Sequence, residues 1–246
     1  MTVTYNPYLV LFSAIIAVVA SYSALNLAGL MVVVRGFDRK ILLAVGGSAM
    51  GIGIWSMHFI AMLAFSIPIP IDYNLVLVGV SLIAAILSSG LAFFIVSLSV
   101  VNIPTLLSGG IVMGVGVALM HYIGMAAMQM PATIHYDPAL FLLSVAIAIV
   151  ASLAALILLL KCREKTGIAL YRWKIISSLI MSVAILALHY TGMAAAMFKP
   201  DAQKIGEDNV FLDNLSMGCF VALFTLIILA ISLSLSFDSG YKSYQE

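Results

Sequence analysis

Long apolar runs alternate with short polar segments along the whole chain. Most of these runs exceed the roughly 18 apolar residues that mark a helix able to cross a bilayer. Turn-forming Pro, Asn and Asp residues lie between them. The pattern predicts an all-α, polytopic membrane protein whose seven transmembrane helices lie at about residues 8–34, 41–66, 75–101, 105–130, 139–160, 175–198 and 214–236.

Composition agrees with this prediction. Of the 246 residues, 64% are hydrophobic and 9% are charged, whereas a soluble domain carries about 25% charged residues. The chain has no basic stripe for nucleic acid. Cys162 and Cys219 are too few for a disulfide framework, so we expect free thiols. The first apolar run is too long for a cleavable signal peptide and lacks its basic start, so we interpret it as a helix.

Basic residues predict the orientation, because cytoplasmic loops are enriched in Lys and Arg. They gather in the loops after the first and fifth helices, which lie on one side of the membrane. The opposite side has two lysines and six acidic residues. We therefore expect the N-terminus outside and the C-terminus in the cytoplasm.

The second, fourth and sixth helices share one pattern. Residues 46–62, 109–125 and 177–193 each read small-small-x-x-Met-small, with a later His followed after four residues by Met. Such repeats change the interpretation of a fold. We predict a single domain, 1–246, of three helical hairpins around a pseudo-threefold axis, at about 8–66, 75–130 and 139–198, with the helix at 214–236 outside the repeat.

Small residues also recur four apart in these helices. This spacing lets helix backbones approach closely in lipid. It predicts that the second, fourth and sixth helices form an inner ring through the pairs Gly47 and Gly51, Gly110 and Gly114, and Ser178 and Ser182.

Three histidines, His58, His121 and His189, hold the same place in the repeat. Each lies about 12 Å from the outer end of its helix, at 1.5 Å per residue. An ionisable side chain inside a membrane indicates a functional site. A methionine follows each histidine by four residues and so shares its helix face. A second tier of methionines lies deeper. The first tier is Met62, Met125 and Met193, and the second is Met50, Met113 and Met181.

Imidazole and thioether together favour copper, because thioether sulfur is a soft ligand. Zinc prefers thiolate, imidazole and carboxylate, and a His/Met pair can also ligate haem iron, so zinc and haem rank below copper. The plainer interpretations are packing histidines and gap-filling methionines. We interpret Phe59, Tyr122 and Tyr190 as packing aromatics and His135 as a solvated loop residue. Asn26 is expected to bond across helices.

The runs Met-His-Tyr-Ile-Gly-Met at 120–125 and Leu-His-Tyr-Thr-Gly-Met at 188–193 resemble the signature of the bacterial MHYT domain family. Residues 57–62 are a looser third copy. The departures from the signature are Phe59, Ile60, Ile123 and Leu188. The histidine and the methionine at +4 are intact in all three copies.

The resemblance implies a sensor domain of the bacterial inner membrane that binds copper near the outer face and senses O2, CO or NO. It also implies cytoplasmic output through GGDEF or EAL domains, which turn over cyclic di-GMP. We expect no enzyme within this chain. It would be the sensor part of a longer protein or would act through a separate partner. The surrounding lipid is its other expected partner, and a homodimer is left open.

Two other functions stay open on the residues alone. The two methionine tiers could form a path, which would make the chain a transporter or channel for copper or small solutes. No acidic residue lies in the predicted helices to couple ions. The third function is a haem-binding membrane redox protein, although no nucleophile–base pair or cofactor loop is visible.

Overall fold

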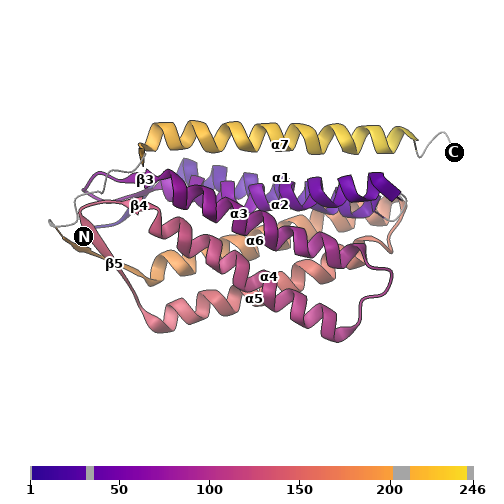
Figure 1. The fold of residues 1–246 in the computed structure, drawn as a ribbon, viewed down its shortest axis with the longest axis horizontal. Helices are drawn as coiled ribbons and strands as arrows, with labels where there is room; N and C mark the ends of the chain where they lie inside the picture. Colours follow the sequence, from indigo (N-terminus) through magenta and orange to yellow (C-terminus); the bar gives the residue numbers. More distant parts are fainter. Residues whose placement is uncertain (1, 32–35, 202–210, 243–246) are drawn as a thin grey trace.

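The structure is a computed structural model and describes residues 2–31, 36–201 and 211–242. The predicted all-α class is confirmed. Figure 1 shows α1 to α6 packed as a bundle, with α7 along one side. The helices of the described residues are α1 (Pro7–Leu30), α2 (Gly36–Ala64), α3 (Leu75–Ser97), α4 (Ile103–Ala126), α5 (Pro138–Cys162), α6 (Gly167–Ala195) and α7 (Asn214–Lys242).

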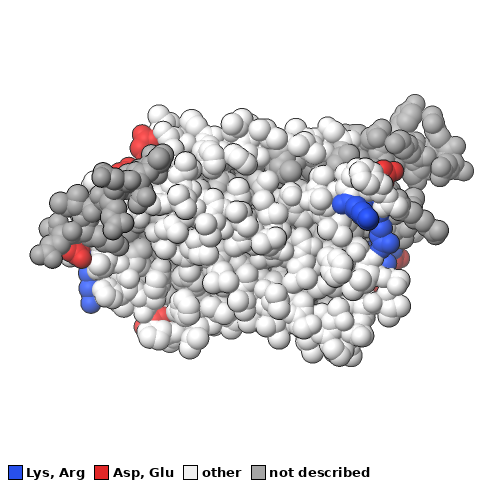
Figure 2. All heavy atoms as spheres, in the orientation of Figure 1, with Lys and Arg blue, Asp and Glu red and all other residues white. Residues whose placement is uncertain are grey.

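Six of these helices, α1 to α6, are long and apolar enough to cross a membrane. The described apolar part of α7 is shorter, at Asn214–Ile227. Figure 2 shows charged side chains at the two ends of the long axis and a broad band without them between these ends. This distribution is that of a multi-pass membrane protein.

The sixth helix begins earlier than predicted, at Gly167 instead of residue 175, so Arg172 and Lys174 are helical. The Nζ of Lys174 donates to Asn26 Oδ1 of α1 at 2.6 Å. Long basic side chains can place their charge near a helix end in this way. The expected bond from Asn26 to another helix is confirmed, and the predicted start of α6 is wrong.

Short strands replace the predicted outer ends of three helices. The helices at 41–66, 105–130 and 175–198 end earlier, because the last residues turn into strands β2, β4 and β6. Each of these pairs antiparallel with the strand that precedes the other helix of its hairpin. Their bounds are β1 (Thr4–Tyr5), β2 (Phe65–Ser66), β3 (Asp72–Asn74), β4 (Met128–Gln129), β5 (Ala132–Tyr136) and β6 (Ala196–Pro200), and β7 (Phe211–Leu212) also pairs with β3.

The same capping arrangement closes the strand-bearing end of all three hairpins. The backbone N–H groups of Asn6, Asn74 and Asp137 each donate to the carbonyl of an alanine, namely Ala64, Ala127 and Ala195, at 2.8 Å. Their side chains accept from the first turns of α1, α3 and α5, which satisfies N–H groups that a helix start leaves unpaired. Each hairpin therefore holds its inner helix at the same height.

The glycine pairs do approach other backbones closely, but not those of the other inner helices. A Cβ at Gly47 or Gly51 would meet the backbone of α3, and one at Gly114 would meet Ile149 of α5. The predicted contact of the small faces with one another is therefore wrong. An outer helix lies between each pair of inner helices and takes up the glycine face.

Candidate metal centre

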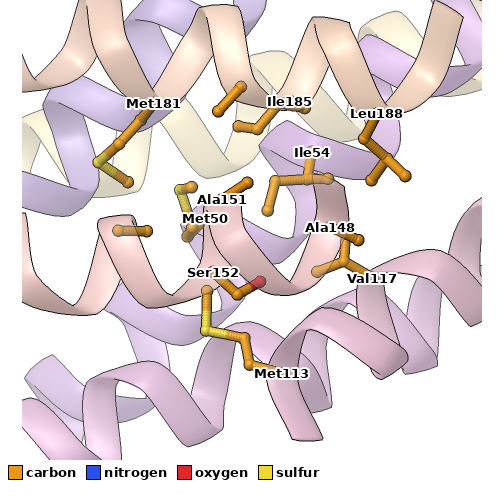
Figure 3. Close-up of a pocket in the computed structure, with 12 residues that line it drawn as sticks. Met50, Ile54, Met113, Val117, Ala148, Ala151, Ser152, Met181, Ile185 and Leu188 are labelled. Carbon is orange, nitrogen blue, oxygen red and sulfur yellow. The ribbon is translucent and has the colours of Figure 1, made fainter. Parts of the chain in front are cut away.

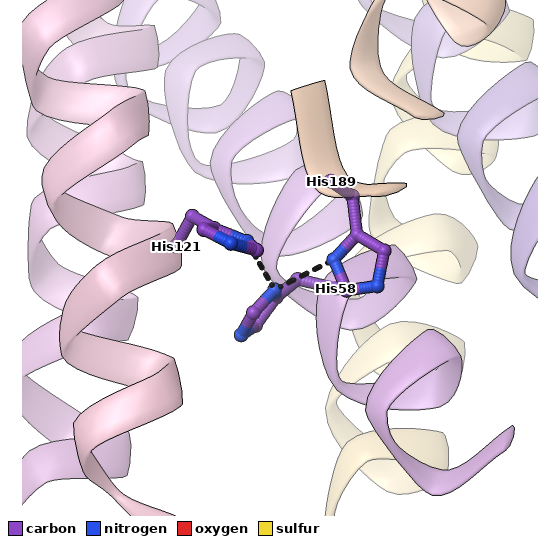
Figure 4. Close-up of side chains that lie close together, drawn as sticks. All are labelled: His58, His121 and His189. Atoms are coloured by element: carbon purple, nitrogen blue, oxygen red, sulfur yellow. Dashed lines mark hydrogen bonds between the residues drawn. The ribbon is translucent and has the colours of Figure 1, made fainter. Parts of the chain in front are cut away.

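Three histidine side chains from three inner helices meet inside the protein. His58 of α2, His121 of α4 and His189 of α6 are each 1% exposed. His58 Nδ1 lies 3.0 Å from His189 Nδ1 and 3.2 Å from His121 Nδ1, as Figure 4 shows. The three ring centroids are 4.9, 5.0 and 5.2 Å apart. The convergence predicted from the repeat is therefore present, and we call these residues the histidine cluster.

Small residues of the neighbouring inner helix make room for the rings. His58 Nε2 faces Gly124 of α4, and His121 Nε2 faces Gly192 of α6. A Cβ atom at either glycine would clash with the histidine ring that faces it. Both glycines lie three residues after the histidine of their own helix, and Ala61 holds that position in α2. The repeat in α4 and α6 thus supplies a histidine ring and, about one turn away, a glycine that leaves space for the ring of another helix. We call this glycine position the ring seat.

The cluster cannot satisfy its own hydrogen bonds. A neutral imidazole nitrogen either donates or accepts in the ring plane, yet His58 Nδ1 has two Nδ1 neighbours. The Nε2 atoms of all three rings are buried and lack a hydrogen-bond partner among the described residues. A buried polar atom without a partner is costly. A cation that accepts the lone pairs of all three Nδ1 atoms would remove the need for these atoms to hydrogen-bond to one another.

The spacing fits a single metal ion. One candidate ligand atom from each histidine lies within 4.8 Å of the others. Around an ion with metal–nitrogen bonds of about 2.0 Å, trigonal or tetrahedral ligands lie about 3.3–3.5 Å apart. The two shortest Nδ1 separations, 3.0 and 3.2 Å, would need to widen by only a few tenths of an ångström. The arrangement can therefore hold one ion between three imidazoles.

The methionines at +4 are buried beside this site. Met62 and Met125 are fully buried and Met193 is 4% exposed. Their position one turn toward the outer end places them on the histidine face of each helix. Ligation by these three thioethers stays a prediction. The deeper methionines, Met50, Met113 and Met181, line one common cavity on the other side of the cluster (Figure 3).

Comparison with known proteins identifies the repeat. A family model described as "Bacterial signalling protein N terminal repeat", MHYT, matches residues 51–109 and 114–171. The chain belongs to the MHYT family. The two matches begin 63 residues apart, which is the shift between the second and fourth helices in the sequence. No solved structure matches the chain.

Three curated relatives are signalling proteins. The bifunctional diguanylate cyclase/cyclic di-GMP phosphodiesterase MucR of Pseudomonas aeruginosa is 43% identical over 95% of this chain and 34% of its own length. The signalling protein YkoW of Bacillus subtilis is 37% identical over 96% and 29%. The cyclic di-GMP phosphodiesterase NbdA of Pseudomonas aeruginosa is 37% identical over 92% and 29%. The MHYT chain thus spans about a third of each relative.

Serines of the outer helices lie beside the aromatic residues of the inner helices. Tyr122 OH donates to Ser144 Oγ of α5 at 2.5 Å, while Ser144 donates to a carbonyl of its own helix. Tyr190 approaches Ser13 of α1, although its hydroxyl makes no hydrogen bond of normal geometry within the described chain. In α2, Phe59 has no hydroxyl. Trp55 Nε1 donates to Ser81 instead, at 3.1 Å.

Sequence reasoning missed these serines. Ser13, Ser81 and Ser144 each lie seven residues after the cap residue of their outer helix, and that common spacing was the available signal. Phe59, Tyr122 and Tyr190 each pack edge-on against the histidine before them at 4.8–4.9 Å, so these aromatics border the cluster. The bonds of Ser81 and Ser144 link α2 and α4 to outer helices α3 and α5.

The surroundings of the cluster carry little charge. The group of potential ligands contains no carboxylate in the described ranges. In the strands above the cluster, burial raises the pKa of the Tyr136 hydroxyl to about 12, and nearby Tyr122 adds to the rise. Burial likewise raises the pKa of Tyr5. These phenols stay neutral at physiological pH. His135 is exposed, as expected, but lies in strand β5 and not in a loop. Cys162 and Cys219 are free, as expected.

Proposed function

We propose that the chain is a membrane-embedded sensor domain that binds one copper ion through Nδ1 of His58, His121 and His189. The convergence of these three buried rings carries the proposal. Met62, Met125 and Met193 would add a thioether from the outer side. A diatomic gas, O2, CO or NO, would bind the ion at a remaining coordination position, and the altered ligation would shift the packing of the inner helices.

Charge favours the reduced ion. The cost of burying a cation rises steeply with its charge, and this site has no carboxylate among its described neighbours to offset it. A monovalent ion therefore fits better than Zn²⁺ or Cu²⁺. Thioether and imidazole are also suitable ligands for Cu(I). We expect copper to be held mainly as Cu(I), with zinc and haem as weaker candidates.

The seventh helix offers an output path. It packs mainly on α2, where Thr225 Oγ1 donates to Ser56 Oγ at 2.6 Å in a buried contact. Trp55 of α2 stacks edge-on against Phe220 and Phe224 of α7. Ser56 lies two residues before His58 on the chain, so a shift of α2 at the metal would move the surface on which α7 rests.

We further propose that α7 is a seventh transmembrane helix, since its 29 residues span about 44 Å. Three hairpins would then surround a pseudo-threefold axis, with the N-terminus outside and the C-terminus in the cytoplasm of a bacterial inner-membrane protein. The names of MucR and NbdA point to cyclic di-GMP turnover as the output. The enzyme activity would reside in GGDEF or EAL domains outside this domain.

Copper content tests the proposal. Purified protein from copper-replete cells is expected to contain about one copper per chain, and the variant with His58, His121 and His189 all changed to alanine is expected to contain almost none. His135→Ala is the matched control, because His135 is exposed and lies in strand β5, outside the helices that carry the cluster. Equal copper in the triple variant and the wild type would refute the proposal.

Copper transport is the second candidate. It is favoured by the common cavity that Met50, Met113 and Met181 share beneath the cluster. A copper-loaded liposome assay separates the two functions. Protein-dependent copper flux would support transport, whereas flux equal to that of protein-free liposomes would support the sensor.

A further inference from the structure

The cavity beneath the histidine cluster, here called the inner cavity, has a defined place in the repeat. Its volume is about 30 Å³. Corresponding residues of three inner helices line it, namely Ile54, Val117 and Ile185, each four positions before a histidine, together with the deeper methionines. Leu188, directly before His189, closes one side. The cavity therefore lies about one helical turn below the cluster.

The fourth wall comes from α5 and consists of small residues. Ala148, Ala151, Ser152 and Ala155 lie at i, i+3, i+4 and i+7, so they share one helix face. Their short side chains leave the space open, and Figure 3 shows Ala151 and Ser152 facing the methionine side chains. Apart from the hydroxyl of Ser152, the lining side chains are apolar.

Such a space selects its occupant by size and polarity. A water molecule needs two to four polar partners, whereas apolar cavities stay dry and take up small nonpolar molecules such as xenon. Ser152 supplies a single polar side chain here. The volume is that of about one small molecule. An anion would lose its hydration here without gaining a positively charged partner or a set of hydrogen-bond donors.

We propose that the inner cavity is a binding site for one small, neutral, nonpolar molecule of diatomic size, which reaches the histidine cluster from this side. The second part rests on the proposed metal-binding function, but the first does not. The thioethers of Met62, Met125 and Met193 lie one turn toward the outer side of the cluster, so the inner side is left for an exogenous ligand.

Xenon tests the cavity without a metal. Xenon-129 NMR of the purified full chain in nanodiscs is expected to show one saturable site. Ala151→Val fills the cavity and should weaken xenon binding by about fivefold or more, while Ser152→Ala removes the only lining hydroxyl and should strengthen it by about twofold. Ala146→Val, on the exposed face of the same helix, is the matched control.

Absence of a saturable xenon site in the wild type would overturn the proposal, as would equal xenon binding in wild type and Ala151→Val. If Ala151→Val does not fold, the gain expected for Ser152→Ala decides the matter, since unchanged xenon affinity in that variant would also count against the cavity.

Carbon monoxide tests the route. In copper-loaded protein, CO recombination after flash photolysis should slow in Ala151→Val, with copper content and the Ala146→Val rate unchanged. Equal rates would overturn the route from the inner side. A protein that binds xenon here but holds no copper would refute the proposed function and leave the cavity assignment standing.

Discussion

Two inner helices, α2 and α4, carry nearly the same segment in different surroundings. Each supplies one histidine to the cluster and a methionine four residues later. In α2, 72% of the apolar segment is buried within the protein, against 39% in α4. The difference arises largely from α7, which packs on α2. The repeat therefore places one histidine of each helix in the cluster, while the unrepeated helix α7 packs on only one of these two helices, α2.

The aromatic residues show the same contrast. In α4, Tyr122 bonds directly to its outer-helix serine. In α2 the corresponding Phe59 cannot do so, and Trp55 bonds to Ser81 while its ring also contacts α7. A single side chain thus joins the outer helix, the histidine helix and α7. This arrangement singles out α2 as the helix whose movement the rest of a signalling protein could detect.

The largest effect is expected where a ring seat is filled. Gly124→Ala puts a methyl group against His58 Nε2, and overpacking of this kind costs about 1–3 kcal/mol. We expect at least a tenfold loss of copper affinity, measured by competition with a Cu(I) chelator, and a similar loss in Gly192→Ala. Gly90→Ala is the control, because open space surrounds that position.

The same site in α2 sharpens the comparison. Ala61 already carries a methyl group where α4 and α6 have glycine, so Ala61→Gly should change copper affinity by less than the α4 and α6 substitutions. A larger loss of copper affinity in Ala61→Gly than in Gly124→Ala would show that Gly124 and Gly192 are not needed to make space for the histidine rings.

Metal removal should destabilise all three inner helices together. At a free copper concentration 100 times the Kd, binding stabilises the folded protein by about 2.7 kcal/mol. Thermal unfolding in detergent should therefore shift to lower temperature after chelation of Cu(I), and acidification should release the metal because ligating imidazoles must be neutral. A triple histidine-to-alanine variant should show no shift with chelator; an equal shift would locate the copper elsewhere.

Removing the hydrogen bond between α2 and α7 should alter α7 without altering copper binding. Thr225→Val keeps the shape and removes the hydroxyl that bonds to Ser56, at a cost of about 1 kcal/mol. Backbone amides of α7 should exchange faster with deuterium while copper content stays unchanged. Ser234→Ala, an exposed serine on the same helix, should leave both quantities as they are. Faster exchange throughout α2 and α4 would instead indicate general unfolding.

The smallest effect is expected at the outer-helix serines. Ser144→Ala leaves the Tyr122 hydroxyl without its partner, and Ser81→Ala does the same to the Trp55 N–H. Each should cost about 1 kcal/mol in the free energy of unfolding. Only Ser81→Ala should also alter tryptophan fluorescence and the exchange of α7, because Trp55 contacts that helix. Identical effects of both variants on α7 would remove the distinction between α2 and α4.

The sequence predicted the cluster because one position recurs in three helices of the same direction. His58, His121 and His189 had to lie at one depth once the hairpins were recognised. The partner of the glycine faces could not be predicted in the same way. Gly51 and Gly114 show that a helix can approach closely, but the spacing does not say which helix supplies the backbone that packs there, here at Ile86 of α3 and Ile149 of α5.

The ends of the elements were the other limit. Polar loops between apolar runs predicted turns, but strands β2, β4 and β6 form only because segments distant in sequence supply their hydrogen-bond partners. The early start of α6 places Lys174 within the helix, where its side chain bonds to Asn26 of α1. The strand pairs form within single hairpins, whereas the bond of Lys174 joins two hairpins. Hydropathy along the chain reports neither kind of contact.

X-ray absorption spectroscopy of the copper-loaded protein tests the central claim most directly. Three imidazole nitrogens at about 2.0 Å from one copper per chain are predicted, with any sulfur contribution arising from the methionines at +4, and the nitrogen shell should be lost in His121→Ala. A copper shell made only of sulfur, or a nitrogen shell unchanged by that substitution, would contradict the account.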